Sequence, residues 1–190
     1  MKIRVDFVCR DVAAAELDQV MAIQAAERTG GDAECLSEEP ARQARRLRGM
    51  LRRRVPFRVA VRGSEVLGYA HAVPYQAGRG YAHCVQDVIC VREGDRGRGI
   101  GTILLGDFLF ACRQARLRQV VAFLLAEDHA GLALHEKLGF VPFGRHRNAC
   151  LGGGRLHDVL LLRRDLDRLA VVGVVAERDA ACACTPALSG

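Results

Sequence analysis

Residues 88–101 constrain the fold more than any other part of the chain. An apolar, β-branched run ends near Val91, a glycine-rich basic turn follows, and a helical pattern begins directly after it. The turn carries Arg96, Gly97, Arg98, Gly99 and Gly101. Its glycines lack the Cβ atoms that would keep a ligand from the backbone amides, and the start of a helix attracts anions. The stretch therefore predicts a strand, an anion-binding turn and a helix, an arrangement suited to a pyrophosphate.

The spacing of the turn excludes two common phosphate loops. A Walker loop ends in Gly-Lys-Ser/Thr, and this turn has no lysine; the fingerprint G-x-G-x-x-G would need a glycine at Thr102. The spacing Arg96-x-x-Gly99-x-Gly101 instead resembles the R/Q-x-x-G-x-G/A loop of the GCN5-related N-acetyltransferases (GNAT), which hold the pyrophosphate of acetyl-CoA. For this turn taken alone, a solvated loop is the alternative interpretation.

Composition indicates one ordinary globular domain of 190 residues, with 50% hydrophobic and 26% charged residues. No apolar run is long enough to span a bilayer, and Asp6 interrupts the first apolar stretch, so we expect no membrane association and a cytoplasmic location. The net charge of +6 indicates attraction to anions, which a polyanionic cofactor would explain. We expect no nucleic-acid partner, because the arginines of residues 42–54 have no aromatic residues among them.

The order of elements predicts an α/β fold with a mixed sheet. We expect a strand at Ile3–Val8, a helix capped by Asp11 that runs to about Arg28, and a second helix from Glu38 or Pro40 to about Arg54. Further strands are expected at 57–61, 66–73, 85–91, 120–125, 140–145 and 159–162, with helices at about 102–115 and 131–138, the latter capped by Asp128 and stopped by Gly139. We predict a single domain over 1–168 and a loosely ordered C-terminal extension over 169–190.

A second motif strengthens the resemblance. The segment Leu132-Ala-Leu-His-Glu-Lys-Leu-Gly-Phe140 is similar to the A-x-x-L-Y-E-K-L-G-F segment of the GNAT family. Two motifs in the right order are far more specific than either alone. From about residue 2 to 168 the chain most resembles the phosphinothricin and methionine sulfoximine acetyltransferases, through Gly68-Tyr-Ala-His-Ala-Val-Pro-Tyr75, Tyr81, His135-Glu136, Gly144, Arg147 and His157-Asp-Val159.

This resemblance implies a GNAT fold, a mixed central β-sheet with splayed strands flanked by helices. It also implies a homodimer that moves an acetyl group from acetyl-CoA to the amine of a small molecule, such as an amino acid or an analogue like phosphinothricin. Cofactor-binding positions are then Ile89, Cys90, Val91, Arg96, Gly97, Arg98, Gly99, Ile100, Gly101, Thr102 and Asp128. Substrate-binding positions are His71, Tyr75, Tyr81 and His157, and no metal is expected.

The chemistry of acetyl transfer defines the roles that are needed, and the resemblance implies which positions would fill them. Attack on a thioester requires a neutral amine, an N–H donor for the carbonyl oxygen and an acid for the departing thiolate. His135 stands where the family often has the tyrosine that protonates this thiolate, although a structural histidine covering the sheet is the alternative. The family's glutamate base aligns with Gln86, an amide that accepts no proton at neutral pH. Asp87 is adjacent but should point to the opposite face of the strand.

Several departures keep other interpretations open. Asp128 and Gly131 replace the usual asparagine and serine or alanine, and His71, His83 and His157 are candidate substitutes for the missing base. The rival functions are an acyl-CoA-binding protein with little or no turnover, a protein or polyamine N-acetyltransferase, and an arginine-rich nucleic-acid binder. The acceptor is not identified by the sequence, because acceptor loops vary independently of the cofactor site.

Overall fold

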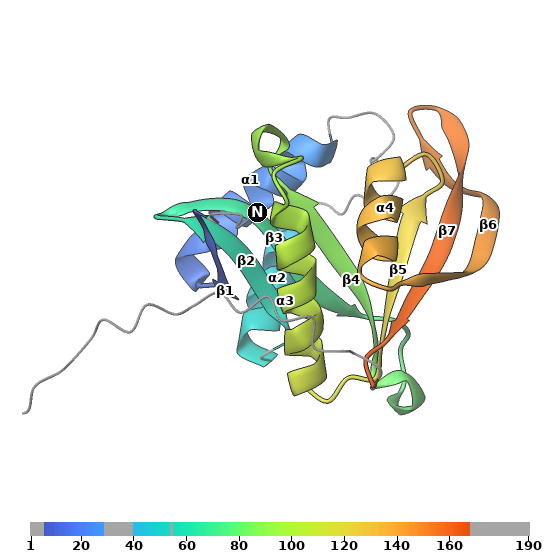
Figure 1. Ribbon diagram of the computed structural model, residues 1–190, viewed down its shortest axis with the longest axis horizontal. Coiled ribbons are helices and arrows are strands. Elements are labelled where there is room, and N and C mark those ends of the chain that lie inside the picture. The colour runs from blue at the N-terminus through green and yellow to red at the C-terminus, as the bar shows by residue number, and fades with distance from the viewer. Residues whose placement is uncertain (1–5, 29–39, 54, 168–190) are drawn as a thin grey trace, which may run out of the picture.

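The computed structural model describes residues 6–28, 40–53 and 55–167 (Figure 1). Its strands form one sheet in the order β1-β2-β3-β4-β5-β7-β6. They are β1 (Val8–Asp11), β2 (Phe57–Arg62), β3 (Glu65–Pro74), β4 (Cys84–Val91), β5 (Gln119–Leu125), β6 (Val141–Gly152) and β7 (Arg155–Asp165). The helices are α1 (Leu17–Arg28), α2 (Pro40–Arg53), α3 (Ile100–Gln114) and α4 (His129–Lys137), with short 3-10 turns η1 (Ala14–Glu16), η3 (Arg79–Tyr81) and η4 (Glu93–Asp95). The expected mixed α/β architecture is confirmed.

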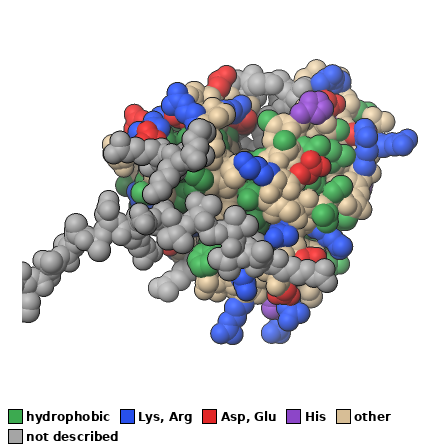
Figure 2. Space-filling view, in the orientation of Figure 1, with side chains coloured by type: hydrophobic (Ala, Val, Ile, Leu, Met, Phe, Trp, Pro, Cys, Tyr) green, Lys and Arg blue, Asp and Glu red, His purple; other side chains and the backbone are tan. Residues whose placement is uncertain are grey.

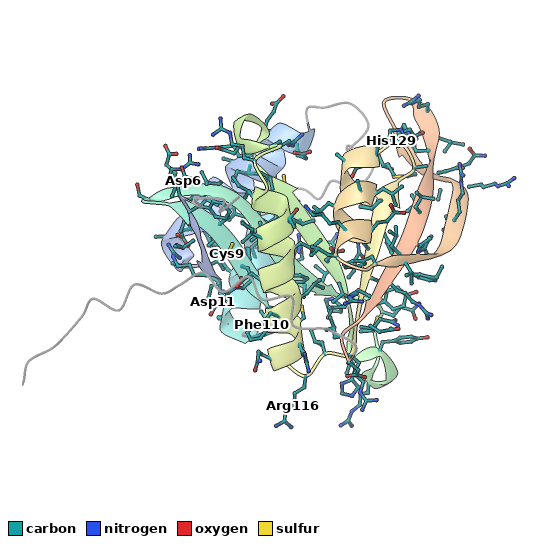
Figure 3. The ribbon with its side chains drawn as sticks, viewed as in Figure 1. Asp6, Cys9, Asp11, Phe110, Arg116 and His129 are labelled. Atoms are coloured by element: carbon teal, nitrogen blue, oxygen red, sulfur yellow. The ribbon has the colours of Figure 1, made fainter. Side chains whose placement is uncertain are left out.

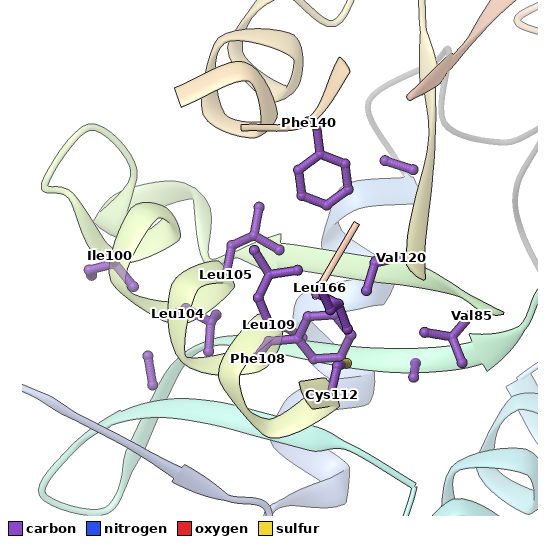
Figure 4. Packing of buried hydrophobic residues seen from close by; sticks show 14 of the residues in the cluster. Val85, Ile100, Leu104, Leu105, Phe108, Leu109, Cys112, Val120, Phe140 and Leu166 are labelled. Atoms are coloured by element: carbon purple, nitrogen blue, oxygen red, sulfur yellow. The ribbon is translucent and has the colours of Figure 1, made fainter. Parts of the chain in front are cut away.

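Two helical layers cover the sheet. Helices α3 and α4 lie on one face and α1 and α2 on the other (Figure 1). The buried side of α3 repeats at helical spacing, with Leu104, Leu105, Phe108, Leu109 and Cys112 packed against the sheet (Figure 4). Leu47 and Met50 of α2 pack instead on the opposite face. Successive side chains of β4 point alternately to the α3 and α4 face and to the α1 and α2 face. A residue's place in the strand therefore determines the face that it occupies.

The sheet opens between β4 and β5. These parallel strands pair over three positions in the described structure, Cys84 with Gln119, Val85 with Val120 and Gln86 with Val121. Beyond Gln86 the strands diverge, and α4 lies in front of the opening (Figure 1). The register of β4 with β3 continues to Val91, and that of β5 with β7 continues to Leu125, so the sheet separates into two parts at this point. This is the splay that the family resemblance implies.

Some local predictions are wrong. Asp11 does not cap a helix: it is the last residue of β1, pairs with Arg58 of β2, and precedes η1 and α1 (Figure 3). Strands β6 and β7 are much longer than expected because Gly153 and Gly154, both at positive φ, close them into a two-residue hairpin. The residues before Asp6, and those predicted as a C-terminal extension, lie outside the described part of the chain.

The face that carries α3 and α4 bears charged side chains of both signs. Figure 2 shows basic and acidic side chains interspersed with hydrophobic ones there. In the described segments, no helix is both long and apolar enough to cross a membrane.

Candidate active site

Backbone amides of β4 point into the opening between β4 and β5. The N–H of Arg92 donates to Leu67 O on β3 at 2.8 Å. Because peptide groups alternate direction along a strand, the N–H groups of Ile89 and Val91 point away from β3, toward the side that β5 has left. Cys90 between them is buried on the α1 and α2 face. The opening thus presents the free amides that a thioester carbonyl and a pantetheine arm require.

The glycine turn joins this strand to α3. Gly97 and Gly99 have φ of +74° and +81°, and a Cβ at either position would meet no atom within 4 Å. Glycine is therefore required here for its backbone conformation and for open access to the amides. Gly99 is the N-cap of α3, so the first amides of that helix face the turn. Ile100 is buried under the turn, and Thr102 is half-buried in the first helical turn.

Arg96 is not directed solely at an anion. Its Nε–H donates to Val91 O at 3.0 Å, and its guanidinium forms an ion pair with Glu27 near the end of α1. The thiol of Cys90 donates to the same Glu27 carboxylate at 3.3 Å. Arg96 therefore ties the turn both to the end of β4 and to the helix on the other face of the sheet.

Asp95 organises the remaining arginines of the turn. Its carboxylate is only 5% exposed and lies 2.6 Å from Arg92 Nε, 3.4 Å from Arg98 and 3.6 Å from Arg62. The hydrogen bond from Arg92 holds the pKa of Asp95 below its usual range. Asp95 was not predicted as a site residue, although its position among arginines in the sequence was a signal for it. The guanidinium of Arg98 is 60% exposed and can still meet an anion.

The cap that Asp128 forms on α4 explains why residue 131 is a glycine. Its Oδ1 accepts a hydrogen bond from Gly131 N at 2.8 Å and so caps α4, as predicted. A Cβ at Gly131 would overlap the other oxygen of that carboxylate. The departures from the family pattern at Asp128 and Gly131 are therefore linked by sterics.

His135 and Asp87 form a buried pair. His135 Nε2 lies 2.9 Å from Asp87 Oδ2, and its Nδ1 lies 2.7 Å from Gly131 O. The two side chains are 1% and 3% exposed, and the ring of Phe140 packs edge-on against the imidazole. Burial alone would lower the pKa of His135, but the hydrogen bond and the charge of Asp87, together with the hydrogen bond to Gly131 O and the charge of Asp128, outweigh it and raise this pKa above its usual range. Asp87 is thus on the α4 face, as expected from alternation.

Gln86 lies on the opposite face from Asp87 and is half-buried. On that face the rings of Tyr75 and Phe123 meet across β4 at 6.2 Å between centroids, and Tyr81 packs on Tyr75 at 5.9 Å. Tyr81 is 46% exposed. The structure therefore brings the two predicted tyrosines together on the face of Gln86 and adds Phe123, which no sequence motif indicated.

Two predicted substrate ligands are instead buried in the protein. His71 is 0% exposed between Phe57 and Tyr69, and neither ring nitrogen has a hydrogen-bond partner in the described structure. Burial lowers the pKa of His71 to about 3, with a contribution from Arg46. His157 is 1% exposed, and its Nε2–H donates to Gly152 O at 3.1 Å. Because both side chains are buried, neither histidine is placed to contact an acceptor directly. His83, a third candidate base, is exposed just before β4.

Comparison with known proteins identifies the class. The family model described as "Acetyltransferase (GNAT) family" matches residues 17–140, and the chain belongs to this family. The expected class, an N-acetyltransferase that uses acetyl-CoA, is confirmed.

The relatives agree with the resemblance seen in the sequence. A phosphinothricin N-acetyltransferase of Streptomyces coelicolor is 33% identical over 115 residues, which cover 58% of this chain and 67% of that protein. An L-methionine sulfoximine/L-methionine sulfone acetyltransferase of Pseudomonas paraeruginosa is 29% identical over 162 residues, covering 83% and 94%. The crystal structure of a phosphinothricin acetyltransferase from Sinorhizobium meliloti in complex with AcCoA superposes with a TM-score of 0.77 at 27% identity, covering 85% and 89%.

Proposed function

We propose that this chain transfers the acetyl group of acetyl-CoA to the amine of a small α-amino acid or a close analogue. One observation carries the proposal: β4 and β5 separate beyond Gln86 directly beside the glycine turn that opens α3. The names of the relatives, phosphinothricin and methionine sulfoximine acetyltransferases, support acceptors of this size.

The residues at the opening fit acetyl-CoA. Amides of Ile89 and Val91 would bind the pantetheine arm and polarise the carbonyl. The turn amides, the N-terminus of α3 and Arg98 would bind the pyrophosphate. Arg96 would act mainly by fixing the turn to Val91. When bound, acetyl-CoA supplies the activated acetyl group.

The acceptor would approach on the face of Gln86. The rings of Tyr75, Tyr81 and Phe123 form an apolar wall there, which suits the side chain of an amino acid. Gln86 can orient an amine by hydrogen bonding but cannot take its proton. Turnover should therefore depend on the fraction of neutral amine in solution and rise with pH.

An amine panel tests the proposal. Thiol release from acetyl-CoA is measured with phosphinothricin, methionine sulfoximine, methionine sulfone, a polyamine and an alanine-terminated peptide, and products are verified by mass. We expect acetylation of the small amino acids alone. Preference for the polyamine or the peptide would overturn the acceptor assignment. Acetyl-CoA binding without turnover of any amine would favour the second candidate, an acyl-CoA-binding protein, for which the amide of Gln86 is the supporting observation.

We also propose, from the resemblance, a cytoplasmic homodimer whose single catalytic domain spans 1–168. Sedimentation at micromolar concentration should give about twice the 20.7 kDa chain mass. A monomer throughout that range would contradict the dimer without affecting the cofactor site.

A further inference from the structure

Carboxylates of the protein itself compensate the arginines around the glycine turn. Several of these arginines share the buried carboxylate of Asp95, namely Arg62, Arg92 and Arg98. A further arginine, Arg96, pairs with Glu27 near the end of α1. Each compensating carboxylate reduces the attraction of its arginine for an external anion. The turn thus offers a pyrophosphate less positive charge than its sequence indicates.

The contacts of Arg96 direct its guanidinium toward α1. The Nε–H donates to Val91 O at 3.0 Å, and a terminal N–H of the same guanidinium meets the Glu27 carboxylate. A guanidinium holds its five N–H donors in one rigid plane, so two fixed contacts determine where the others point. Helix α1 lies on the sheet face opposite α3, whose first amides face the turn (Figure 1). Glu27 therefore holds the guanidinium toward α1 rather than over the start of α3.

Glu27 is itself held in place by the strand that borders the opening. The Cys90 thiol donates at 3.3 Å to Oε2 of Glu27, the same oxygen that Arg96 meets. Burial, with the charge and the hydrogen bond of Glu27, raises the pKa of the Cys90 thiol, so this thiol stays protonated and can act as a donor. Cys90 lies between Ile89 and Val91, whose amides face the opening. One carboxylate of α1 thus contacts both the strand and the turn that would bind the cofactor.

We propose that Glu27 is a positioning residue that holds Arg96 back from the pyrophosphate of CoA and so weakens cofactor binding. The inference rests on the proposed function, to which it adds a residue outside the glycine turn. Weaker binding favours release of CoA after each acetyl transfer. Because α1 packs on the same face of β4 as Cys90 and Gln86, the contact also joins the side where the acceptor would approach to the cofactor turn.

Loss of the Glu27 charge should therefore tighten CoA binding. Glu27→Gln keeps the shape of the side chain and removes its charge, which leaves Arg96 free to turn toward an anion. Calorimetric titration with CoA, without any acceptor, should give a Kd about 3- to 10-fold lower than that of wild type, the size expected for one partly exposed charge. The side chains of Glu27 and Arg96 are 40% and 49% exposed, so loss of their pair costs little stability and the variant should fold.

A matched control lies on the same helix. Asp18→Asn removes an equal charge from the first turn of α1, where Asp18 is exposed, and should leave the Kd for CoA within about 2-fold of wild type. A merely structural role of Glu27 would loosen the turn and raise the Kd when the charge is lost. A Kd that is higher or unchanged in Glu27→Gln would therefore overturn the proposal.

Salt concentration separates the electrostatic effect from packing. Exposed charges are screened by salt, so the ratio of the wild-type Kd to the Glu27→Gln Kd should be largest at low ionic strength and should approach unity near about 1 M salt. A ratio that does not depend on salt would contradict the role of the Glu27 charge.

A double variant tests whether Glu27 acts through Arg96. Arg96→Gln introduces the other residue that the family loop R/Q-x-x-G-x-G/A allows at this position. In that background, Glu27→Gln should change the Kd for CoA by less than about 2-fold. Equal tightening in both backgrounds would overturn the positioning role. None of these titrations contains an amine, so an amine panel without turnover would contradict the proposed function alone, while the Kd values decide the role of Glu27.

Discussion

Truncating Asp87 to alanine should be among the most destabilising changes in the protein. His135, 1% exposed, would then be buried beside Gly131 O with no partner for Nε2. Removing one member of a buried charged pair costs about 3–5 kcal/mol. For a domain of this size each kcal/mol lowers Tm by about 2–4 °C, so the loss should be roughly 6–20 °C. Asp87→Asn retains both hydrogen bonds with a neutral ring and should cost only about 1 kcal/mol.

The effect should also depend on pH with a defined sign. The pKa of His135 is raised in the folded protein, so the stabilisation by the pair is complete below the unfolded value of about 6.5 and is lost as pH rises through the folded value. Urea unfolding at about pH 6 and about pH 9 should therefore show a larger penalty for Asp87→Ala at the lower pH. A penalty below about 1 kcal/mol at both pH values would refute the reasoning, because exposed ion pairs contribute that little.

Three further predictions concern the cofactor turn, the acceptor side and the cap of α4. Acetyl-CoA at 100 times Kd should stabilise wild type by about 2.7 kcal/mol and raise its Tm. Gly99→Glu should abolish this rise in Tm, whereas Gly106→Glu farther along α3 should keep it; equal Tm shifts in the two variants would remove the turn from the site. Gln86→Glu should raise kcat/KM near pH 7, where only about one in a hundred acceptor amines of pKa near 9 is neutral; a wild-type rate that is already fast and flat with pH would indicate another base. Gly131→Ala should lower the free energy of unfolding by about 1 kcal/mol or more, because the new Cβ overlaps the Asp128 carboxylate. Calorimetry of the double variant Asp128→Ala/Gly131→Ala should show a loss smaller than the sum of the two single losses, and full additivity would contradict the steric coupling.

Local pattern was sufficient to predict most of the fold. The helical spacing of apolar residues in α3 reflects packing on the sheet, and the alternation along β4 reflects packing on both faces of the sheet. Such periodic apolar residues can be recognised from the sequence. Asp11 shows the limit of such reasoning: an aspartate before a helical pattern resembles an N-cap, yet its pairing with Arg58 across strands determined its place. The β6–β7 hairpin was missed because the exposed strand β6 lacks an apolar alternation, although Gly153-Gly154 was an available turn signal.

The candidate site could be predicted only where its residues lie close together in a short sequence motif. The glycine turn and the cap at Asp128 follow from neighbours in sequence. The Asp87–His135 pair joins positions 48 residues apart, and the Arg96–Glu27 pair joins positions 69 apart, so neither could be read from local spacing. His71 shows the converse: it lies within a family-like segment, but its burial between two rings depends on the tertiary packing of β2 and β3.

The narrow junction of β4 with β5 has a mechanical consequence. Three residue pairs join a half-sheet of β1 to β4 to a half-sheet of β5, β7 and β6, so this seam carries far fewer cross-strand hydrogen bonds than the long β6–β7 ladder. Amide hydrogens along the seam should exchange with solvent sooner than those inside either half. A cofactor bound by both half-sheets would hold them together and reduce local opening along the seam. Slower deuterium uptake at Gln119 and Val121, whose amides face β4, would then report occupancy of the site without any chemical turnover.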